Sequence, residues 1–309
     1  MKKIVFICAA MMAFAATAFA QECEYDQQTG VIKIWKHTGM LKGYFTVNAE
    51  GKQVRFSQGN LQYNSDTQKW QFAEHQYDYI GNTTGNTSIT VDGKANNTGV
   101  ADLFGWVGAS SSWDEGLKKY GLTSSTTTNA VDGYGNVASE SLKSDWGKLM
   151  GSTWRTLTYS EWGYLFDSRT GTRASTVNGT TNARFVKATV NGKYGVILFP
   201  DGGTFASSEF TVVGSINKTD ANYTVTTCTL SQWEALEAKG CVFLPLAGRR
   251  SGTTVNTAYG YYRTSTGDNA NQAGVMRFGY SSSYFLYSRS NEPRSYGASV
   301  RHVKDVLTP

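Results

Sequence analysis

The hydrophobic pattern in the middle of the chain predicts two short amphipathic helices. The first begins after Thr158, which forms a T-x-x-E capping box with Glu161 and precedes apolar residues at i, i+3 and i+4 within 162–166. The second is predicted from the S-x-x-E box of Ser231 and Glu234. We expect both helices to pack a tryptophan-bearing side onto the core.

Apolar runs bounded by turn residues predict strands on both sides of these helices. Hairpins are expected in residues 44–57 and 60–74, with turns at 49–51 and 64–67. Asn191-Gly192 lies between two apolar runs and indicates a two-residue hairpin, because both turn positions need positive φ. Further strands are expected at 30–39, 241–248, 259–266, 273–282, 283–290 and 297–305.

Two stretches, 81–100 and 121–136, are rich in Gly, Asn, Thr and Ser and are expected to be surface loops. Between them, Leu103, Phe104 and Trp106 make the sequence more apolar than a free loop. We therefore expect this inserted segment to be fixed to the body of the protein by its aromatic residues.

The first twenty residues have the pattern of a secretory signal peptide. Lys2 and Lys3 precede an apolar run that ends in Ala18-Phe19-Ala20, an A-x-A cleavage site. This run is shorter than the roughly 20 residues that span a bilayer; an uncleaved anchor is the alternative. We expect a leader at 1–20, an N-terminal segment at 21–42 and one domain at 43–309. The mature protein would be exported to the periplasm, cell surface or exterior, and would not be an integral membrane protein.

Charge and cysteine content change this picture little. Removal of Lys2 and Lys3 lowers the formal net charge from +5 to +3, too weak a charge to predict nucleic-acid binding. Cys228 and Cys241 flank the second predicted helix, and about ten helical residues separate their Cα atoms by roughly 15 Å, too far for a disulfide. We expect Cys241 to be a small core residue.

The order of several motifs resembles a known group of exported bacterial proteins. These motifs are "WRTLTYSEWGYLF", "YGVILFPDG", "VFLPLAGRRSG", "YGYYRTST" and "GASVRHV". They are similar to proteins with a formylglycine-generating-enzyme-like, C-type-lectin-type fold, in particular the Fibrobacter-type major paralogous domain proteins and the variable proteins of diversity-generating retroelements. The resemblance implies an α+β, C-type-lectin-like domain with two packed helices, short antiparallel strands and long irregular loops. Arg263-Thr264 replaces the Trp-Ser of many relatives, and we expect this arginine to point outward.

The residues used for chemistry by members of the resembled group are missing. Its sulfatase-activating enzymes use two cysteines in the C-terminal part of the domain, where this chain has none after Cys241. Other relatives bind iron through three histidines, whereas His37, His75 and His302 lack a metal-ligand spacing. We therefore expect no metal, no cofactor and no catalytic residue.

The stretch Tyr280–Tyr296, "YSSSYFLYSRSNEPRSY", has the composition of a binding surface. Tyrosine offers a large rigid contact, serine an adaptable hydrogen bond, and arginine a planar multi-donor head. An ordinary hairpin that turns at the serines explains the same residues, and both interpretations can hold. The predicted ligand-binding residues are Arg263, Arg277, Tyr280, Ser282, Tyr284, Tyr287, Arg289, Asn291, Arg294 and Tyr296.

These patterns favour an exported, non-enzymatic binding protein whose C-terminal surface contacts a surface protein or a glycan. The resemblance to retroelement-diversified proteins suggests that residues 262–297 are the variable segment. Two other classes remain open at this point: an enzyme that retains the family's groove, and a structural component of the cell envelope.

Overall fold

The computed structural model describes residues 39–88, 99–123, 133–212, 216–217, 225–279 and 288–306, together with the backbone of three strands nearer the N-terminus. The chain divides into two compact units, Met1–Met40 and Leu41–Pro309. In the first unit, an antiparallel sheet has the order β1 (Phe6–Ile7), β2 (Glu22–Asp26) and β3 (Val31–Ile34). Strand β3 lies within the run that the sequence pattern predicts.

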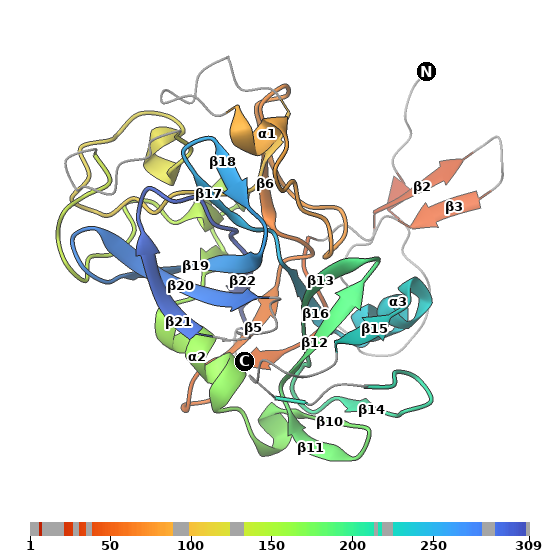
Figure 1. Cartoon of the computed structure of the whole chain (residues 1–309). Helices are drawn as coiled ribbons and strands as arrows, with labels where there is room; N and C mark the ends of the chain where they lie inside the picture. The colour runs from red at the N-terminus through yellow and green to blue at the C-terminus, as the bar shows by residue number, and fades with distance from the viewer. Residues whose placement is uncertain are drawn as a thin grey trace. The chain divides into compact units, whose positions relative to one another are not determined.

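The second unit combines several small sheets with few helices, as the α+β class requires (Figure 1). The α-helices in its described part are α1 (Thr84–Thr87), α2 (Tyr159–Asp167) and α3 (Leu230–Ala238). Short 3-10 helices are η1 (Lys118–Tyr120), η3 (Trp146–Met150) and η4 (Gly171–Arg173). None of the helices in this described part is long and apolar enough to cross a bilayer.

Two four-stranded sheets and three smaller ones surround the C-terminal sheet. One has the order β4 (Phe45–Thr46), β5 (Gln53–Phe56), β22 (His302–Asp305), β9 (Trp154–Thr156), so the last strand joins segments from distant parts of the chain. The other has the order β15 (Thr226–Cys228), β12 (Phe185–Val190), β13 (Lys193–Leu198), β16 (Val242–Pro245). The smaller ones are β11 (Thr180–Ala183), β10 (Ser175–Val177), β14 (Thr204–Phe205); β7 (Lys69–Phe72), β6 (Leu61–Asn64), β8 (Val100–Ala101); and β17 (Arg249–Ser251), β18 (Thr254–Asn256).

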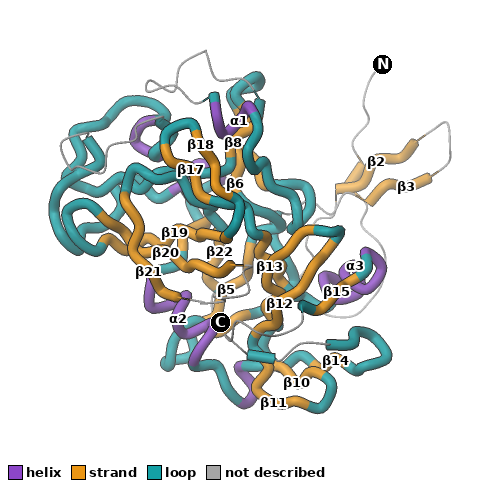
Figure 2. Tube along the Cα trace, in the orientation of Figure 1, coloured by secondary structure: helices purple, strands orange, loops and turns teal. Residues whose placement is uncertain are grey.

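The C-terminal sheet is antiparallel and has the order β19 (Tyr259–Gly267), β20 (Gln272–Gly279), β21 (Ser288–Pro293). Figures 1 and 2 show β21 as its outer strand and α2 beside it. Strand β21 continues to Pro293, three residues beyond the end of the predicted strand at 283–290, whereas residues 283–287 lie outside the described part.

Local sequence signals account for α2 and for the β12–β13 hairpin. Thr158 Oγ1 accepts a hydrogen bond from the Glu161 amide, and the Thr158 amide donates to Glu161 Oε2, so the predicted capping box is confirmed. Arg155 donates two further hydrogen bonds to the same carboxylate, at 2.7 and 2.8 Å. Asn191 and Gly192 have φ of 49° and 70°, which confirms the two-residue turn.

The predicted cap of the second helix was wrong by two residues. Helix α3 begins after Thr229, whose hydroxyl accepts from the Gln232 amide while the Thr229 amide donates to Gln232 Oε1. Glutamine can close a capping box as glutamate does, so a T-x-x-Q box two residues earlier replaces the expected box of Ser231 and Glu234.

The main core lies between α2 and the inner face of the C-terminal sheet. Trp162 is fully buried, and its ring centroid lies 6.1 Å from that of Tyr262. Tyr262 stacks on Phe278 at 5.5 Å, and Met276 joins the same cluster. Because residues alternate across a strand, this packing assigns Tyr261 and Arg277 to the other face of the sheet.

The two predicted surface loops are partly internal. Within 81–100, α1 buries Gly85 and Asn86, and the Asn86 amide nitrogen donates to the buried Asp102 carboxylate at 2.8 Å. Within 121–136, Leu122 and Tyr134 are buried. Residues 89–98 and 124–132 lie outside the described parts. The inserted segment between the loops is fixed as expected, since Leu103, Phe104 and Trp106 are fully buried.

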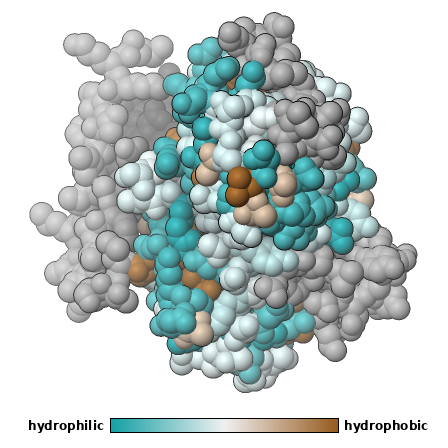
Figure 3. Space-filling model, turned by 90° about the vertical axis from the view of Figure 1, so that its left-hand side faces the viewer, coloured by the Kyte–Doolittle hydropathy of each residue, from teal (hydrophilic) through white to brown (hydrophobic). Residues whose placement is uncertain are grey.

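Little apolar surface is exposed on the side of the molecule that carries the loops of 101–145 in Figure 1. In Figure 3 this face is mostly hydrophilic, with only a small hydrophobic group near its centre. The exposed large hydrophobic side chains of the described residues are Tyr44, Val137, Tyr194 and Leu230, which are far apart in sequence. The described residues of this face therefore form no wide apolar patch of the kind found in an obligate protein interface.

Candidate functional site

A row of tyrosine and arginine side chains covers the outer face of the C-terminal sheet. Tyr259 and Tyr261 extend from β19, and Arg277 lies opposite Tyr261 on β20. Arg249 is contributed by β17, and Tyr296 follows β21. We call these five residues the tyrosine–arginine strip.

Each member of the strip contacts the next, through cation–π contacts and one T-shaped pair of rings. The Arg277 guanidinium carbon lies 5.7 Å from the Tyr259 ring centroid, and the Tyr259 and Tyr261 centroids are 6.0 Å apart. Arg249 lies over both Tyr261, at 5.3 Å, and Tyr296, at 4.6 Å. Tyr261 is 5% exposed, whereas the other four side chains are partly exposed. The strip thus combines three rings with two cations, and cation–π contacts hold the side chains in place.

One carboxylate neutralises one end of the strip. Arg249 donates to Glu292 on β21 at 2.6 Å, and the Glu292 side chain is buried. Burial raises the pKa of Tyr261, although the nearby guanidinium groups of Arg249 and Arg277 oppose this rise, so its hydroxyl stays protonated at neutral pH. In the described part of the chain, no carboxylate lies within ion-pair distance of Arg277.

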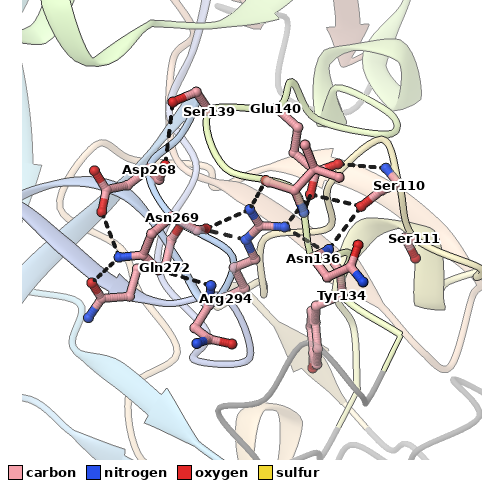
Figure 4. Close-up of polar contacts among 12 residues, drawn as sticks. Ser110, Ser111, Tyr134, Asn136, Ser139, Glu140, Asp268, Asn269, Gln272 and Arg294 are labelled. Carbon is pink, nitrogen blue, oxygen red and sulfur yellow. Dashed lines mark hydrogen bonds and ion pairs between the residues drawn. The ribbon is translucent and has the colours of Figure 1, made fainter.

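Arg294, a predicted ligand-binding residue, is buried and has a structural role. Figure 4 shows its guanidinium at the centre of four converging segments. It pairs with Glu140 and donates to the carbonyl oxygens of Val137 and Asn269, each at 2.8 Å. Glu140 also accepts from the Ser110 amide at 2.6 Å. We call Arg294, Glu140 and these backbone partners the arginine clamp; it fixes the loops at one end of the β19–β20 hairpin.

The expectation that Arg263 points outward was wrong. Its side chain is fully buried, and it donates to the carbonyl oxygens of Phe104, Pro293, Arg294 and Tyr296. These carbonyl oxygens need hydrogen-bond donors. A tryptophan side chain at this position would have only one N–H group to donate. Arg263 and Arg294 therefore cannot contact a ligand in this conformation.

The remaining predicted site residues fall into two groups. Tyr280, Ser282, Tyr284 and Tyr287 lie outside the described residues, and Arg289 is described by its backbone alone. Asn291 is exposed on β21 but faces the side opposite to Glu292, away from the strip. Arg277 and Tyr296 are thus the predicted residues that the described structure brings together.

Sequence analysis missed Arg249 and left Tyr259 and Tyr261 unassigned. The available signal was the motif "GRRSG", which lies shortly before "YGYYR" in a region of recurring arginine and tyrosine. It could not reveal the pairing of Arg249 with Glu292, because these residues are 43 positions apart.

The described cysteines are both buried in one hydrophobic cluster, whereas the described histidines differ in exposure. Burial raises the pKa of Cys228 to about 12 and raises that of Cys241 as well, and both thiols are free. Burial lowers the pKa of His302 to about 4, whereas His75 is exposed beside Asp78. In the parts of the chain that the structure describes, no group of three or more His, Cys, Asp or Glu side chains could hold a metal ion.

Comparison of the chain with known proteins leaves its family open. No family model, no curated protein and no solved structure matches it. The C-type-lectin-like resemblance, and the function that it implies, therefore remain predictions from sequence motifs.

Proposed function

We propose that this chain is an exported binding protein with a C-type-lectin-like domain, and that it contacts a surface protein or glycan through the tyrosine–arginine strip. The observation that carries the proposal is the stacking of partly exposed rings and guanidinium groups on a sheet whose other face belongs to the main core. Such side chains are already ordered before a ligand arrives, so binding costs little conformational entropy.

The sequence next to the strip supports the same function. The connection between β20 and β21, residues 280–287, leaves and re-enters the sheet at Gly279 and Ser288, and Ser288 pairs with Arg277. Its sequence is "YSSSYFLY". The serine- and tyrosine-rich segment thus starts and ends beside one end of the strip.

The proposal extends to diversification of residues 262–297 by a retroelement. Buried residues inside this segment, above all Arg263 and Arg294, support the fold and should stay constant. Variation should instead occur at Arg277, at 280–291 and at Tyr296. Sequencing of sibling strains tests this, and an invariant segment next to an active retroelement would refute it.

A binding screen tests the proposed function. The purified full chain is presented to immobilised glycans and to surface proteins, beside a Tyr259→Ala/Tyr296→Ala variant. The control is Tyr44→Ala, because Tyr44 is 46% exposed and carries a stacked arginine, Arg55 at 5.5 Å, outside the strip. Loss of a partner in the double variant alone supports the proposal. A partner that all three proteins retain, or no partner in any class, contradicts it.

A further inference from the structure

Positive charge is concentrated in the part of the chain that builds the strip. From Arg249 to Arg301 there are seven arginines, no lysine and two carboxylates, Asp268 and Glu292. This net charge of +5 equals that of the whole chain, so the remaining residues are neutral in sum. Charge that is concentrated in one region produces an electric field on that side of the molecule. The net charge of the whole chain does not reveal this field.

Three of these arginines, Arg250, Arg263 and Arg301, are buried with no carboxylate within ion-pair distance among the described residues, and the first two lie near the strip. Arg250 donates to the carbonyl oxygens of Gly252, at 2.9 Å, and Leu103, at 3.3 Å, and Arg263 binds carbonyls only. Neither has a carboxylate within ion-pair distance in the described part of the chain. Burial lowers the pKa of each to about 10, so both stay charged at neutral pH.

These buried charges lie close to the strip. Arg250 is adjacent to Arg249, and Arg263 is two residues after Tyr261 on the same strand and face. Arg263 also donates to the carbonyl oxygen of Tyr296, whose ring carries Arg249 at 4.6 Å. Charge in the low-dielectric interior is weakly screened, and it makes the surface above it attractive to anions.

Among the described residues, Arg277, at the end of the strip farther from Glu292, has no carboxylate within ion-pair distance. Arg249 is neutralised by Glu292, but Arg277 stacks on Tyr259 without a carboxylate partner in the described chain. A guanidinium in this position can donate two parallel hydrogen bonds to a carboxylate. The partly exposed Tyr259 ring offers an apolar face beside it.

We propose that the tyrosine–arginine strip binds an acidic polysaccharide, whose carboxylate or sulfate groups pair with Arg277 while its sugar rings stack on Tyr259 and Tyr296. A polymer that repeats sugar rings, whose C–H faces pack on aromatic rings, and anionic groups matches a strip that combines tyrosine rings with guanidinium groups. The partly exposed arginine and tyrosine side chains of the strip favour such a ligand over an apolar protein surface. This inference rests on the proposed function and names the chemistry of its ligand.

The test uses defined polymers and a matched pair of arginine variants. Binding of the full chain to polygalacturonate, hyaluronate and chondroitin sulfate is measured, with neutral dextran and polyglutamate as comparisons. Arg277→Gln should weaken binding to at least one acidic polysaccharide about tenfold, and Arg277→Lys should restore part of it. Arg55→Gln removes an arginine stacked on Tyr44 at 5.5 Å and should leave binding unchanged. Raising salt from roughly 0.05 M to roughly 0.5 M should weaken the interaction further.

Three outcomes would overturn the inference. The first is that no acidic polysaccharide binds, or that Arg277→Gln binds as the wild type does. The second is that dextran binds equally well. The third is that polyglutamate binds as tightly, which would assign the site to an acidic peptide. A different result would separate the two proposals. If Tyr259→Ala abolishes binding of a partner, while Arg277→Gln and added salt leave its affinity unchanged, the proposed function stands and this inference fails.

Discussion

Arg294 and Arg277 belong to the same β20–β21 region, and both were predicted ligand contacts, yet the structure uses them differently. Arg294 is 2% exposed and is saturated by Glu140 and backbone carbonyls. Arg277 is partly exposed and rests on Tyr259 without a carboxylate partner among the described residues. The comparison between the clamp and the strip shows that the number of carbonyl partners, rather than residue type, distinguishes a structural arginine from one available for a ligand.

The largest expected effect would come from breaking the clamp. Arg294→Met leaves Glu140 buried without its cation and several carbonyls without a donor, so we expect a loss of about 3–5 kcal/mol in the free energy of unfolding. Arg277→Met should change it by no more than about 0.5 kcal/mol. Urea unfolding of both variants checks this, and similar losses in the two would abolish the distinction between clamp and strip.

Acid should destabilise the strand that closes the fold. Burial lowers the pKa of His302 to about 4 from an ordinary 6.5; nearby Asp145 opposes this shift and Arg301 adds to it. The unfolded chain therefore binds a proton first, and stability is lost as the pH falls from 6.5 toward 4. The pKa difference of His302 between the unfolded and folded chain corresponds to a loss of about 3 kcal/mol in the free energy of unfolding.

His302→Phe isolates this contribution, because the ring lies 5.9 Å from Phe72 and neither nitrogen has a partner among the described residues. We expect the variant to gain stability over the wild type between pH 6.5 and 4, with a constant difference above pH 8. Asp102 acts in the opposite direction in both proteins, since burial raises its pKa to about 6 and protonation favours the fold. A difference that does not change with pH would contradict the prediction.

A smaller effect tests the corrected start of α3. Thr229→Ala removes the hydroxyl that accepts from the Gln232 amide and should cost about 1 kcal/mol. Ser231→Ala, at the position first predicted as the cap, should cost far less. Thermal unfolding of the two variants measures this, and the reverse order would restore the original assignment.

The smallest expected effect concerns the neutralised end of the strip. Glu292→Gln removes the partner of Arg249, whose side chain is 28% exposed, and should cost less than about 1 kcal/mol of stability. The freed cation should strengthen binding of an acidic polysaccharide by roughly two- to fivefold. Weaker binding at unchanged stability would mean that Glu292 itself contacts the ligand.

Local features of the fold could be predicted because their partners are close in sequence. Thr158 and Glu161 are three residues apart, and Asn191-Gly192 determines its own turn. The environments of Arg263 and Arg294 could not be predicted. Most of their partners are backbone carbonyl oxygens, up to 160 residues away, and a carbonyl has no signature in the sequence.

The sequence indicated the region of the candidate site, but it could not show which side chains lie together there. Composition alone indicated the region, since tyrosine and arginine recur there. Which of them share a face depends on register and on the contribution of β17, which brings Arg249 beside Tyr296. Strand alternation also removes Asn291 from the strip, although it lies next to Glu292 in sequence.

The central claim is that ligand contacts lie on the tyrosine–arginine strip. Hydroxyl-radical footprinting of the full chain, with and without a bound partner or polygalacturonate, compares exposed tyrosines directly. We expect Tyr259 and Tyr296 to lose reactivity in the complex, while Tyr44 and Tyr194, which are 46% and 39% exposed, keep theirs. Protection of Tyr44 or Tyr194 with unchanged reactivity at Tyr259 and Tyr296 would place the ligand elsewhere and contradict the account.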